Sequence, residues 1–183
     1  DSFETFIDAN RNNTQDPDEP AVGDFKLMQD AGINTLRLYH HAANPSLLSK
    51  LHEQYGFMML MGDLVGMYTV GSGAKWEDGT DYLDPAQRQR MTQSVRQMVR
   101  EYKDEPYVLM WVLGNENNYG GVHGIVGGRG NAAQHPKEYY AFLNELAEGI
   151  HNEDPDHPVA IANGEWLHLE HIARDLLNAL RDG

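Results

Sequence analysis

The sequence predicts an α/β domain in which parallel strands are joined by helical crossovers. Helix-like and strand-like segments alternate along the 183 residues, and the strand-like segments are short apolar runs. Links from helix to strand are short, whereas two links from strand to helix, 62–84 and roughly 114–135, are long. In parallel α/β folds the functional residues lie on the loops that follow the carboxyl ends of the strands. A functional site is therefore expected on these long loops.

The first half of the chain predicts two helices and two strands. Asp24–Ala31 reads as a helix because a glycine follows it as a C-terminal stop, and Asn34–Tyr39 is a β-prone strand. Pro45–Tyr55 repeats apolar residues at helical spacing and ends at Gly56. Phe57–Met61 is a continuous apolar run, which predicts a strand buried on both faces.

The second half repeats the same alternation. Asp84 is an N-cap followed by a proline at the first helical position, so a helix begins there. Tyr107–Leu113 reads as the next buried strand, Pro136 opens another helix, and Val159–Ala162 is a fourth strand. A last helix carries apolar residues between positions 169 and 180. The segment 1–20 is polar and is expected to be irregular, within one domain that spans 1–183.

Composition excludes several classes of function. Apolar residues make up 40% and charged residues 23% of the chain, as in a soluble globular protein. No apolar stretch is long enough for a membrane span, and nothing at the start resembles a signal peptide. The net charge of −14 argues against nucleic acid as a partner and favours a neutral or cationic one. Without cysteines, disulfides, zinc–thiolate sites and cysteine nucleophiles are excluded, and the localisation stays open.

One stretch combines a buried strand with chemistry. In VLMWVLGNENNYG, residues 108–120, an apolar run stops at Gly114, and Asn115 and Glu116 follow at once. Gly and Asn are also turn residues, so a plain polar turn is the alternative. The place of the stretch, at the carboxyl end of a strand and before a long loop, favours a functional carboxylate. The glycine-rich segment 120–130 lacks the Gly-Lys-Ser/Thr ending of a phosphate-binding loop and reads as a mobile loop over the site.

These residues also carry a resemblance. GINTLRLYHHAANPSLLSKLHEQYGF, residues 32–57, and DEPYVLMWVLGNE, residues 104–116, resemble the TIM-barrel catalytic domain of family 2 glycoside hydrolases, in clan A. In that clan, Trp-x-x-Gly-Asn-Glu ends the fourth barrel strand and its Glu is the general acid/base. The resemblance implies a retaining β-glycosidase or transglycosidase that acts on O-glycosidic bonds of an oligo- or polysaccharide, with no cofactor and no metal. Glu116 would be the acid/base, and Asn115 would bind the sugar 2-hydroxyl.

Further site residues follow from the same resemblance. Arg37 matches an Arg that ends the second strand and supports the nucleophile in relatives, and a histidine-rich loop that lines the sugar pocket follows it. HPVAIANGEW, residues 157–166, resembles the fifth strand with its pocket residues. The implied substrate-binding residues are Asn115, Arg37, His40, His41, Asn163, Glu165 and Trp166.

The chain departs from the family in the number of strands. A complete barrel has eight strands in about 250 residues, whereas four are found here, matching the second to the fifth. A partial barrel is therefore expected, and the strand that bears the family's nucleophile has no counterpart. Phe3–Ala9 is a poor match to the missing first strand. Asp63 or Glu165 could supply a local second carboxylate, but pocket-lining or structural roles suit them better.

The chemistry explains why two differently tuned carboxyl groups are needed. One must donate a proton to the leaving oxygen while the other stays ionised near the developing oxocarbenium ion. Apolar groups such as Trp111 behind Glu116 are expected to raise its pKa by desolvation, whereas Arg37 would lower the pKa of a neighbouring carboxylate.

Two alternatives of other classes remain open. A half-barrel leaves two sheet edges and an apolar inner face unpaired, so the chain could be a non-catalytic piece that self-associates or binds carbohydrate. His40 and His41 could instead be ligands of a metal-dependent hydrolase, although neighbours on an extended segment point to opposite sides. Trp166 and Trp76 could stack on a sugar ring or simply pack.

Overall fold

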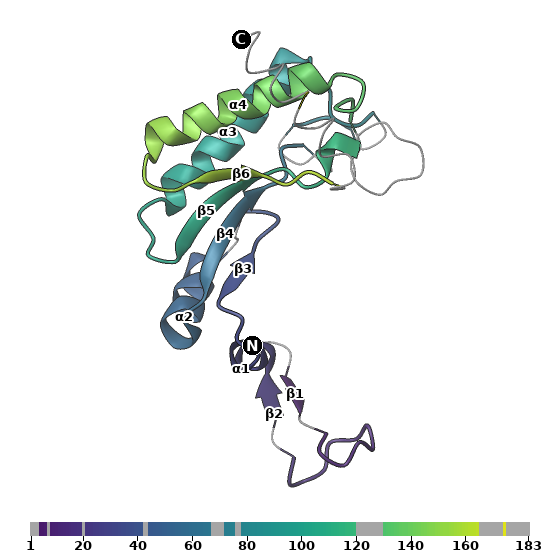
Figure 1. Ribbon diagram of the computed structural model, residues 1–183, viewed down its shortest axis with the longest axis vertical. Coiled ribbons are helices and arrows are strands. Elements are labelled where there is room, and N and C mark those ends of the chain that lie inside the picture. The colour runs from purple at the N-terminus through teal and green to yellow at the C-terminus, as the bar shows by residue number, and fades with distance from the viewer. Residues whose placement is uncertain are drawn as a thin grey trace.

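The computed structural model describes residues 4–6, 8–19, 21–41, 44–66, 72–75, 78–119, 130–164 and 174. Strands β3 to β6 form one parallel sheet in sequence order, and β1 and β2 form a separate antiparallel pair (Figure 1). In the described ranges no helix is both long and apolar enough to cross a membrane. The elements are β1 (Glu4–Phe6), β2 (Ala21–Gly23), α1 (Asp24–Asp30), β3 (Thr35–Arg37), α2 (Pro45–Tyr55), β4 (Met58–Asp63), α3 (Pro85–Tyr102), β5 (Val108–Leu113), the 3-10 turn η1 (Asn117–Tyr119), α4 (Pro136–Glu153) and β6 (Val159–Ile161).

The predicted alternation of helices and strands is confirmed over the described part. Parallel neighbours cannot be joined by a tight turn, so α2, α3 and α4 each connect two adjacent strands. Figure 1 shows these helices on one side of the sheet. The predicted last helix, 169–180, lies outside the described residues except for Arg174, which is helical.

The helix boundaries follow from the capping residues that the sequence contains. Asn44 accepts a hydrogen bond from the Leu47 N–H at the start of α2, and Gly56 ends that helix with φ 74°. Asp84 accepts hydrogen bonds from the N–H groups of Ala86 and Gln87 at the start of α3. These bonds to its charged form lower the pKa of Asp84.

The core lies between the sheet and its helices. Side chains alternate along a strand, so every second residue of β4 and β5 faces the helices. Met59, Met61, Trp111 and Leu113 on that face are fully buried. The helices contribute to the same cluster Leu48, Leu51, Met91, Val95, Met98, Val99, Tyr139, Phe142, Leu143 and Leu146.

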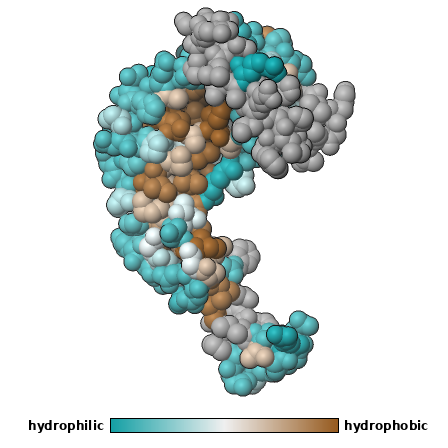
Figure 2. Space-filling view, viewed as in Figure 1, coloured by the Kyte–Doolittle hydropathy of each residue, from teal (hydrophilic) through white to brown (hydrophobic). Residues whose placement is uncertain are grey.

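The other face of the sheet is only half covered, which corrects the expectation of strands buried on both faces. Met58, Leu60, Met110 and Ala160 point to this face by alternation and are half-buried, although Val112 is buried. Figure 2 shows hydrophobic surface over the middle of the sheet, bordered by hydrophilic residues. A closed barrel buries this face inside its ring of strands, and the described strands form an open arc.

The N-terminal segment contains one short strand that the expectation of irregularity left out. Glu4–Phe6 pairs antiparallel with Ala21–Gly23, and not with β3, so this segment is no barrel strand. Between Asp8 and Glu19 there is no helix or strand. The Glu19 carboxylate holds this loop by accepting hydrogen bonds from the N–H groups of Ala9 at 2.8 Å and Asp16 at 3.1 Å.

A buried polar cluster joins the middle of β5 to the segment that precedes β6. The Trp111 indole Nε1–H donates to Asp154 Oδ2 at 2.7 Å, and His157 Nδ1 lies 2.8 Å from the same oxygen. Burial raises the pKa of Asp154, but the hydrogen bonds from Trp111, His157 and the Asp156 N–H outweigh it, so the net pKa is lowered. The carboxylate is therefore bound in its ionised form.

We expect Asp154→Ala to lower the free energy of unfolding by about 1–3 kcal/mol at pH 7, because the buried Trp111 N–H loses its acceptor. A lowered folded pKa gives stability that is present above the unfolded pKa of about 3.9 and is lost as pH falls through the folded value. The difference in the free energy of unfolding between Asp154→Ala and the wild type should therefore shrink below about pH 4. Urea unfolding at several pH values measures it. The exposed neighbour is the control: Asp156→Ala should change stability by less than about 0.5 kcal/mol. Equal effects of both substitutions would contradict this account.

Gly62 lets β3 and β4 approach closely at their carboxyl ends. A Cβ at Gly62 would lie 2.0 Å from the Leu38 carbonyl oxygen. We expect Gly62→Ala to destabilise the protein by about 1–3 kcal/mol through this backbone clash. Gly149→Ala is the matched control, because a Cβ in that helical position meets nothing within 4 Å, and it should be neutral or stabilise by up to about 1 kcal/mol. Thermal unfolding measures both variants. An unchanged melting temperature in Gly62→Ala would contradict the clash and show that β3 and β4 separate easily here.

Candidate active site

The predicted site residues gather where the parallel strands end. Arg37 is the last residue of β3, Asn115 and Glu116 follow β5, and Asn163 follows β6. Since all strands of a parallel sheet point the same way, these residues share one rim of the sheet, on the side of the long loops. The predicted placement of Glu116 at the carboxyl end of the strands is thus observed.

The turn after β5 extends the sheet's hydrogen bonds beyond the strand. The Gly114 N–H donates to the Asp63 carbonyl at 2.8 Å, on the β4 side, and the Glu116 N–H donates to the Ala162 carbonyl at 2.7 Å, on the β6 side. The chain turns through left-handed conformations, with φ 72° at Gly114 and φ 59° at Glu116. A non-glycine residue is strained there by roughly 1–3 kcal/mol, so the surrounding contacts must hold it.

Asn117 ties this turn to the loop after β4. Its side chain is buried, with 2% exposure. Asn117 Nδ2 donates to the carbonyls of Leu64 at 2.9 Å and Val65 at 3.1 Å, and lies 2.9 Å from Tyr82 Oη. Asn117 Oδ1 accepts from the Asn115 N–H at 2.7 Å. The residue after the candidate acid is therefore anchored in the core.

Tyr82 completes this anchor. Its hydroxyl donates to the Val65 carbonyl at 2.9 Å. Burial raises the pKa of Tyr82 well above its usual range, although the hydrogen bond from Asn117 opposes the rise. The phenol consequently stays protonated and keeps its donor.

Asn118 ties the same turn to the other neighbouring strand. Its Oδ1 accepts from the Gly164 N–H at 2.8 Å, and its Nδ2 donates to the Gly164 carbonyl at 3.2 Å. Gly164 has no room for a side chain, because a Cβ there would lie 2.1 Å from the Tyr119 ring. The sequence interpretation missed both Asn117 and Asn118, and the only signal available was the run of amides after Glu116.

Arg37 orients the Asn115 amide. Arg37 Nη2 donates to Asn115 Oδ1 at 3.0 Å, and the guanidinium lies over the Tyr39 ring with its carbon 4.4 Å from the centroid. Since arginine only donates, the amide oxygen of Asn115 faces Arg37 and the amide nitrogen faces away. The resemblance implies that Arg37 supports the nucleophile. In this structure Arg37 also contacts Asn115.

His41 and Asp63 meet beside this rim. His41 Nε2 lies 2.6 Å from Asp63 Oδ2, which also accepts from Ser94 Oγ at 2.8 Å, while Asp63 Oδ1 accepts from the Val65 N–H at 2.7 Å. A serine, a histidine and an aspartate together suggest a hydrolytic triad, but such a triad needs the histidine between the other two. Here Ser94 and His41 bind the same carboxylate oxygen. Both Asp63 oxygens are engaged, so Asp63 is a structural anchor and does not suit the role of second carboxylate.

Both histidines of the predicted sugar-binding loop line hollows at the rim. A hollow of about 260 Å³ is bordered by His40, His41, Asp63, Leu64 and Ser94. A neighbouring hollow of about 440 Å³ is bordered by Arg37, Leu38, Tyr39, His40, His41, Asn44, Leu47 and Leu48. His40 is exposed and His41 half-buried. Over the described residues, no three His, Asp or Glu side chains gather closely enough to hold a metal ion.

The remaining predicted site residues differ in what the structure says of them. Asn163 follows β6, and its Oδ1 is buried with no hydrogen-bond partner within the described ranges. Glu165, Trp166 and Trp76 lie outside the described residues. Glu116 itself is exposed. Trp111 does not lie behind it, contrary to expectation, because its indole turns to Asp154, which precedes β6 at the opposite end of the sheet.

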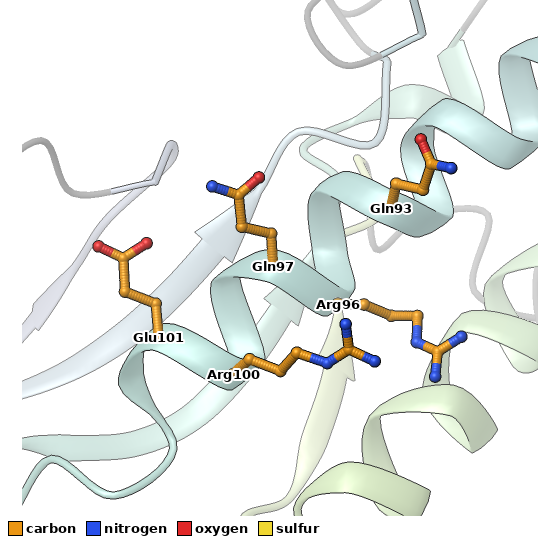
Figure 3. Close-up of a pocket in the computed structure, with 5 residues that line it drawn as sticks. All are labelled: Gln93, Arg96, Gln97, Arg100 and Glu101. Atoms are coloured by element: carbon orange, nitrogen blue, oxygen red, sulfur yellow. The ribbon is translucent and has the colours of Figure 1, made fainter.

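A larger hollow of about 560 Å³ lies on the outer surface along α3, away from the strand ends. Figure 3 shows its lining residues, Gln93, Arg96, Gln97, Arg100 and Glu101. The two arginines point toward α4, where the Nε atoms of Arg96 and Arg100 donate to Glu153 at 2.6 and 2.5 Å. These contacts join α3 to α4 and lower the pKa of Glu153, so this surface has a structural explanation.

Comparisons with known proteins agree with this geometry. The chain is 26% identical over 145 residues to a β-galactosidase of Leuconostoc mesenteroides, covering 78% of this chain and 11% of that protein. It is 30% identical over 106 residues to a probable mannan endo-1,4-β-mannosidase C of Aspergillus terreus, covering 57% of this chain and 25% of that protein. The chain thus spans only a small part of the length of these curated relatives.

Solved structures share the fold. A β-D-glucuronidase of Dictyoglomus thermophilum superposes with a TM-score of 0.54 at 20% identity, covering 78% of this chain and 22% of that chain. A Bifidobacterium dentium β-glucuronidase gives 0.53 at 22% identity over 75% of this chain and 19% of that chain. The family described as glycosyl hydrolases family 2, TIM barrel domain, matches residues 13–175. The predicted partial barrel is confirmed, and the chain belongs to the TIM-barrel domain family of the family 2 glycosyl hydrolases.

Proposed function

We propose that the protein containing this chain is a retaining β-glycosidase or transglycosidase that acts on O-glycosidic bonds of an oligo- or polysaccharide, with Glu116 as general acid/base. One observation carries the proposal. The Glu116 backbone is fixed at the rim of a parallel sheet, because its N–H donates to the carbonyl of Ala162, the residue that directly follows β6. Beside it lies the Asn115 amide, which Arg37 orients. The relatives are named for different sugars, so the proposal extends to β-glycosides and not to one sugar.

The chemistry assigns each residue a task. Glu116 donates a proton to the leaving glycosidic oxygen, and in the second step its carboxylate removes a proton from the attacking water or acceptor hydroxyl. The Asn115 amide hydrogen-bonds a sugar hydroxyl without adding charge near the acid. Arg37 keeps the amide in one orientation, with Arg37 Nη2 at 3.0 Å from Asn115 Oδ1.

Desolvation is supplied by the substrate in this proposal. Glu116 is exposed, and Trp111 packs elsewhere. A sugar ring seated on the rim, over the hollows bordered by His40 and His41, would displace water from the carboxyl group. Asn163, with a buried amide oxygen that finds no partner in the described part, is a further polar contact for a sugar hydroxyl, and Glu165 and Trp166 follow it in sequence.

We expect Glu116→Gln in the complete protein to lower kcat/KM for a disaccharide by about 10²–10⁴-fold, because general acid catalysis is lost. A 2,4-dinitrophenyl β-glycoside needs no proton on its leaving group, so its first step should slow far less. Added azide should accelerate turnover of this aryl substrate, since the anion needs no base. Steady-state and pre-steady-state kinetics measure all three effects. Near-normal turnover of both substrates by Glu116→Gln would end the proposal. Glu101→Gln, which changes an exposed glutamate away from the rim, is the control and should leave both rates unchanged.

A second candidate applies to the 183 residues taken by themselves. Met58, Leu60 and Met110 have half-buried apolar side chains, and β3 and β6 each have one edge that pairs with no further strand among the described residues. Both features favour a non-catalytic half-barrel that associates with a second copy.

We expect the isolated chain to form dimers or larger species at micromolar concentration, with the mass rising with concentration, because burying the inner face removes apolar surface from water. Light scattering coupled to size-exclusion chromatography measures this. Leu60→Glu, which places a charge on that face, should reduce the association. A well-behaved monomer of the unsubstituted chain would contradict the candidate.

A further inference from the structure

Two strained turns meet at one buried side chain. Among the described residues, positive φ angles at non-glycine positions occur at Arg11, Asn13, Val65 and Glu116. Val65, with φ 48°, is a β-branched residue for which this conformation is especially unfavourable. Asn117 contacts the turns around both Val65 and Glu116, which lie after β4 and β5.

The contacts of Asn117 require a primary amide. Its oxygen accepts from the Asn115 N–H at 2.7 Å, and its nitrogen has the carbonyls of Leu64 and Val65 and the Tyr82 hydroxyl within 3.1 Å. An amide supplies both an acceptor and two donors on one planar group. A carboxylate has no donor, and an apolar side chain has neither, so each would leave buried polar groups unpaired.

The amide is also packed against the turn that it holds. A Cβ at Gly114 would lie 3.0 Å from Asn117 Oδ1, which is closer than ordinary contact. Asn117 Oδ1 thus fills the space beside Gly114 and also accepts the hydrogen bond from the Asn115 N–H. On the other side the Glu116 N–H is fixed to Ala162 at 2.7 Å.

We propose that Asn117 is a positioning residue for Glu116: its buried amide holds the left-handed turn that aims the Glu116 carboxyl at the glycosidic oxygen. This inference rests on the proposed function of Glu116. Proton donation depends on a heavy-atom distance of about 2.6–3.2 Å, and a misplacement of about 1 Å can cost on the order of 100-fold in rate. A loosened turn therefore weakens acid catalysis before it weakens sugar binding.

Substrates with different leaving groups distinguish positioning from a merely structural role. A poor leaving group, such as the second sugar of a disaccharide, needs a well-placed proton, whereas 2,4-dinitrophenolate leaves without one. We expect Asn117→Ala in the complete protein to lower kcat for the disaccharide by about 10–100-fold and for the dinitrophenyl glycoside by about 3-fold or less. KM should change little. A structural role would lower both rates together through the fraction of folded enzyme.

Asn117→Asp gives a second readout through pH. It keeps the shape but places carboxylate oxygens against the carbonyls of Leu64 and Val65, so it should be strongly impaired at neutral pH. Protonation of the new carboxyl in acid restores one donor, and the ratio of variant to wild-type activity should rise as pH falls. Asn117→Ser, which keeps a small donor and acceptor, should recover part of the disaccharide rate that Asn117→Ala loses.

Asn131→Ala is the matched control. Asn131 also uses its amide to hold a loop, accepting from the Tyr82 N–H at 2.9 Å and donating to Asp81 at 2.6 Å. Within the described part of the chain, these side-chain hydrogen bonds do not reach residues 114–116. Asn131→Ala should lower the melting temperature without changing the ratio of kcat for the disaccharide to kcat for the dinitrophenyl glycoside. The same ratio in Asn117→Ala as in wild type would overturn the inference, as would failure of both the alanine and serine variants to fold. If Glu116→Gln leaves the ratio unchanged, the proposed function fails instead.

Discussion

The hydrogen bond from the Glu116 N–H to the Ala162 carbonyl, at 2.7 Å, is the constraint on which the site depends. It continues the pairing of β5 with β6 beyond the strand, just as the Gly114 N–H continues the pairing with β4 through the Asp63 carbonyl at 2.8 Å. Two bonds on opposite sides leave the turn little freedom. A glutamate there has its backbone fixed by the sheet itself, so its position does not depend on a flexible loop.

The two faces of the sheet differ in how tightly they are packed. On the helix face, Met61, Trp111 and Leu113 are fully buried, and Trp111 even finds an acceptor for its indole N–H in Asp154. This packing keeps the strands in register and thereby holds their ends level. The inner face carries Leu60 and Met110 half-buried, and it contributes apolar surface but little rigidity. The precision of the rim therefore comes from the helix face and from the hydrogen bonds at the strand ends.

The sequence predicted the elements well because their signals are local. The α2 helix has the predicted bounds, Pro45–Tyr55, since Asn44 and Gly56 cap it through contacts a few residues away. Contacts between segments that are distant in the sequence could not be predicted from it. The bonds of Asn117 to Leu64 cross 53 positions, and nothing local reveals them. The expected position of Trp111 behind Glu116 was also wrong, because strand alternation gives two faces without saying which one the helices cover.

Preorganisation at this rim is built into the backbone and not into a dry pocket. The exposed Glu116 carboxyl is free of apolar packing from Trp111, yet its main chain is held in a left-handed conformation with φ 59°. Such strain persists only where several contacts over-determine it, and the amides of Asn117 and Asn118 supply them from opposite sides. Under the proposed function, such a site stays open to a bulky glycan until the substrate itself excludes water, while the backbone that carries the proposed acid is already held in place.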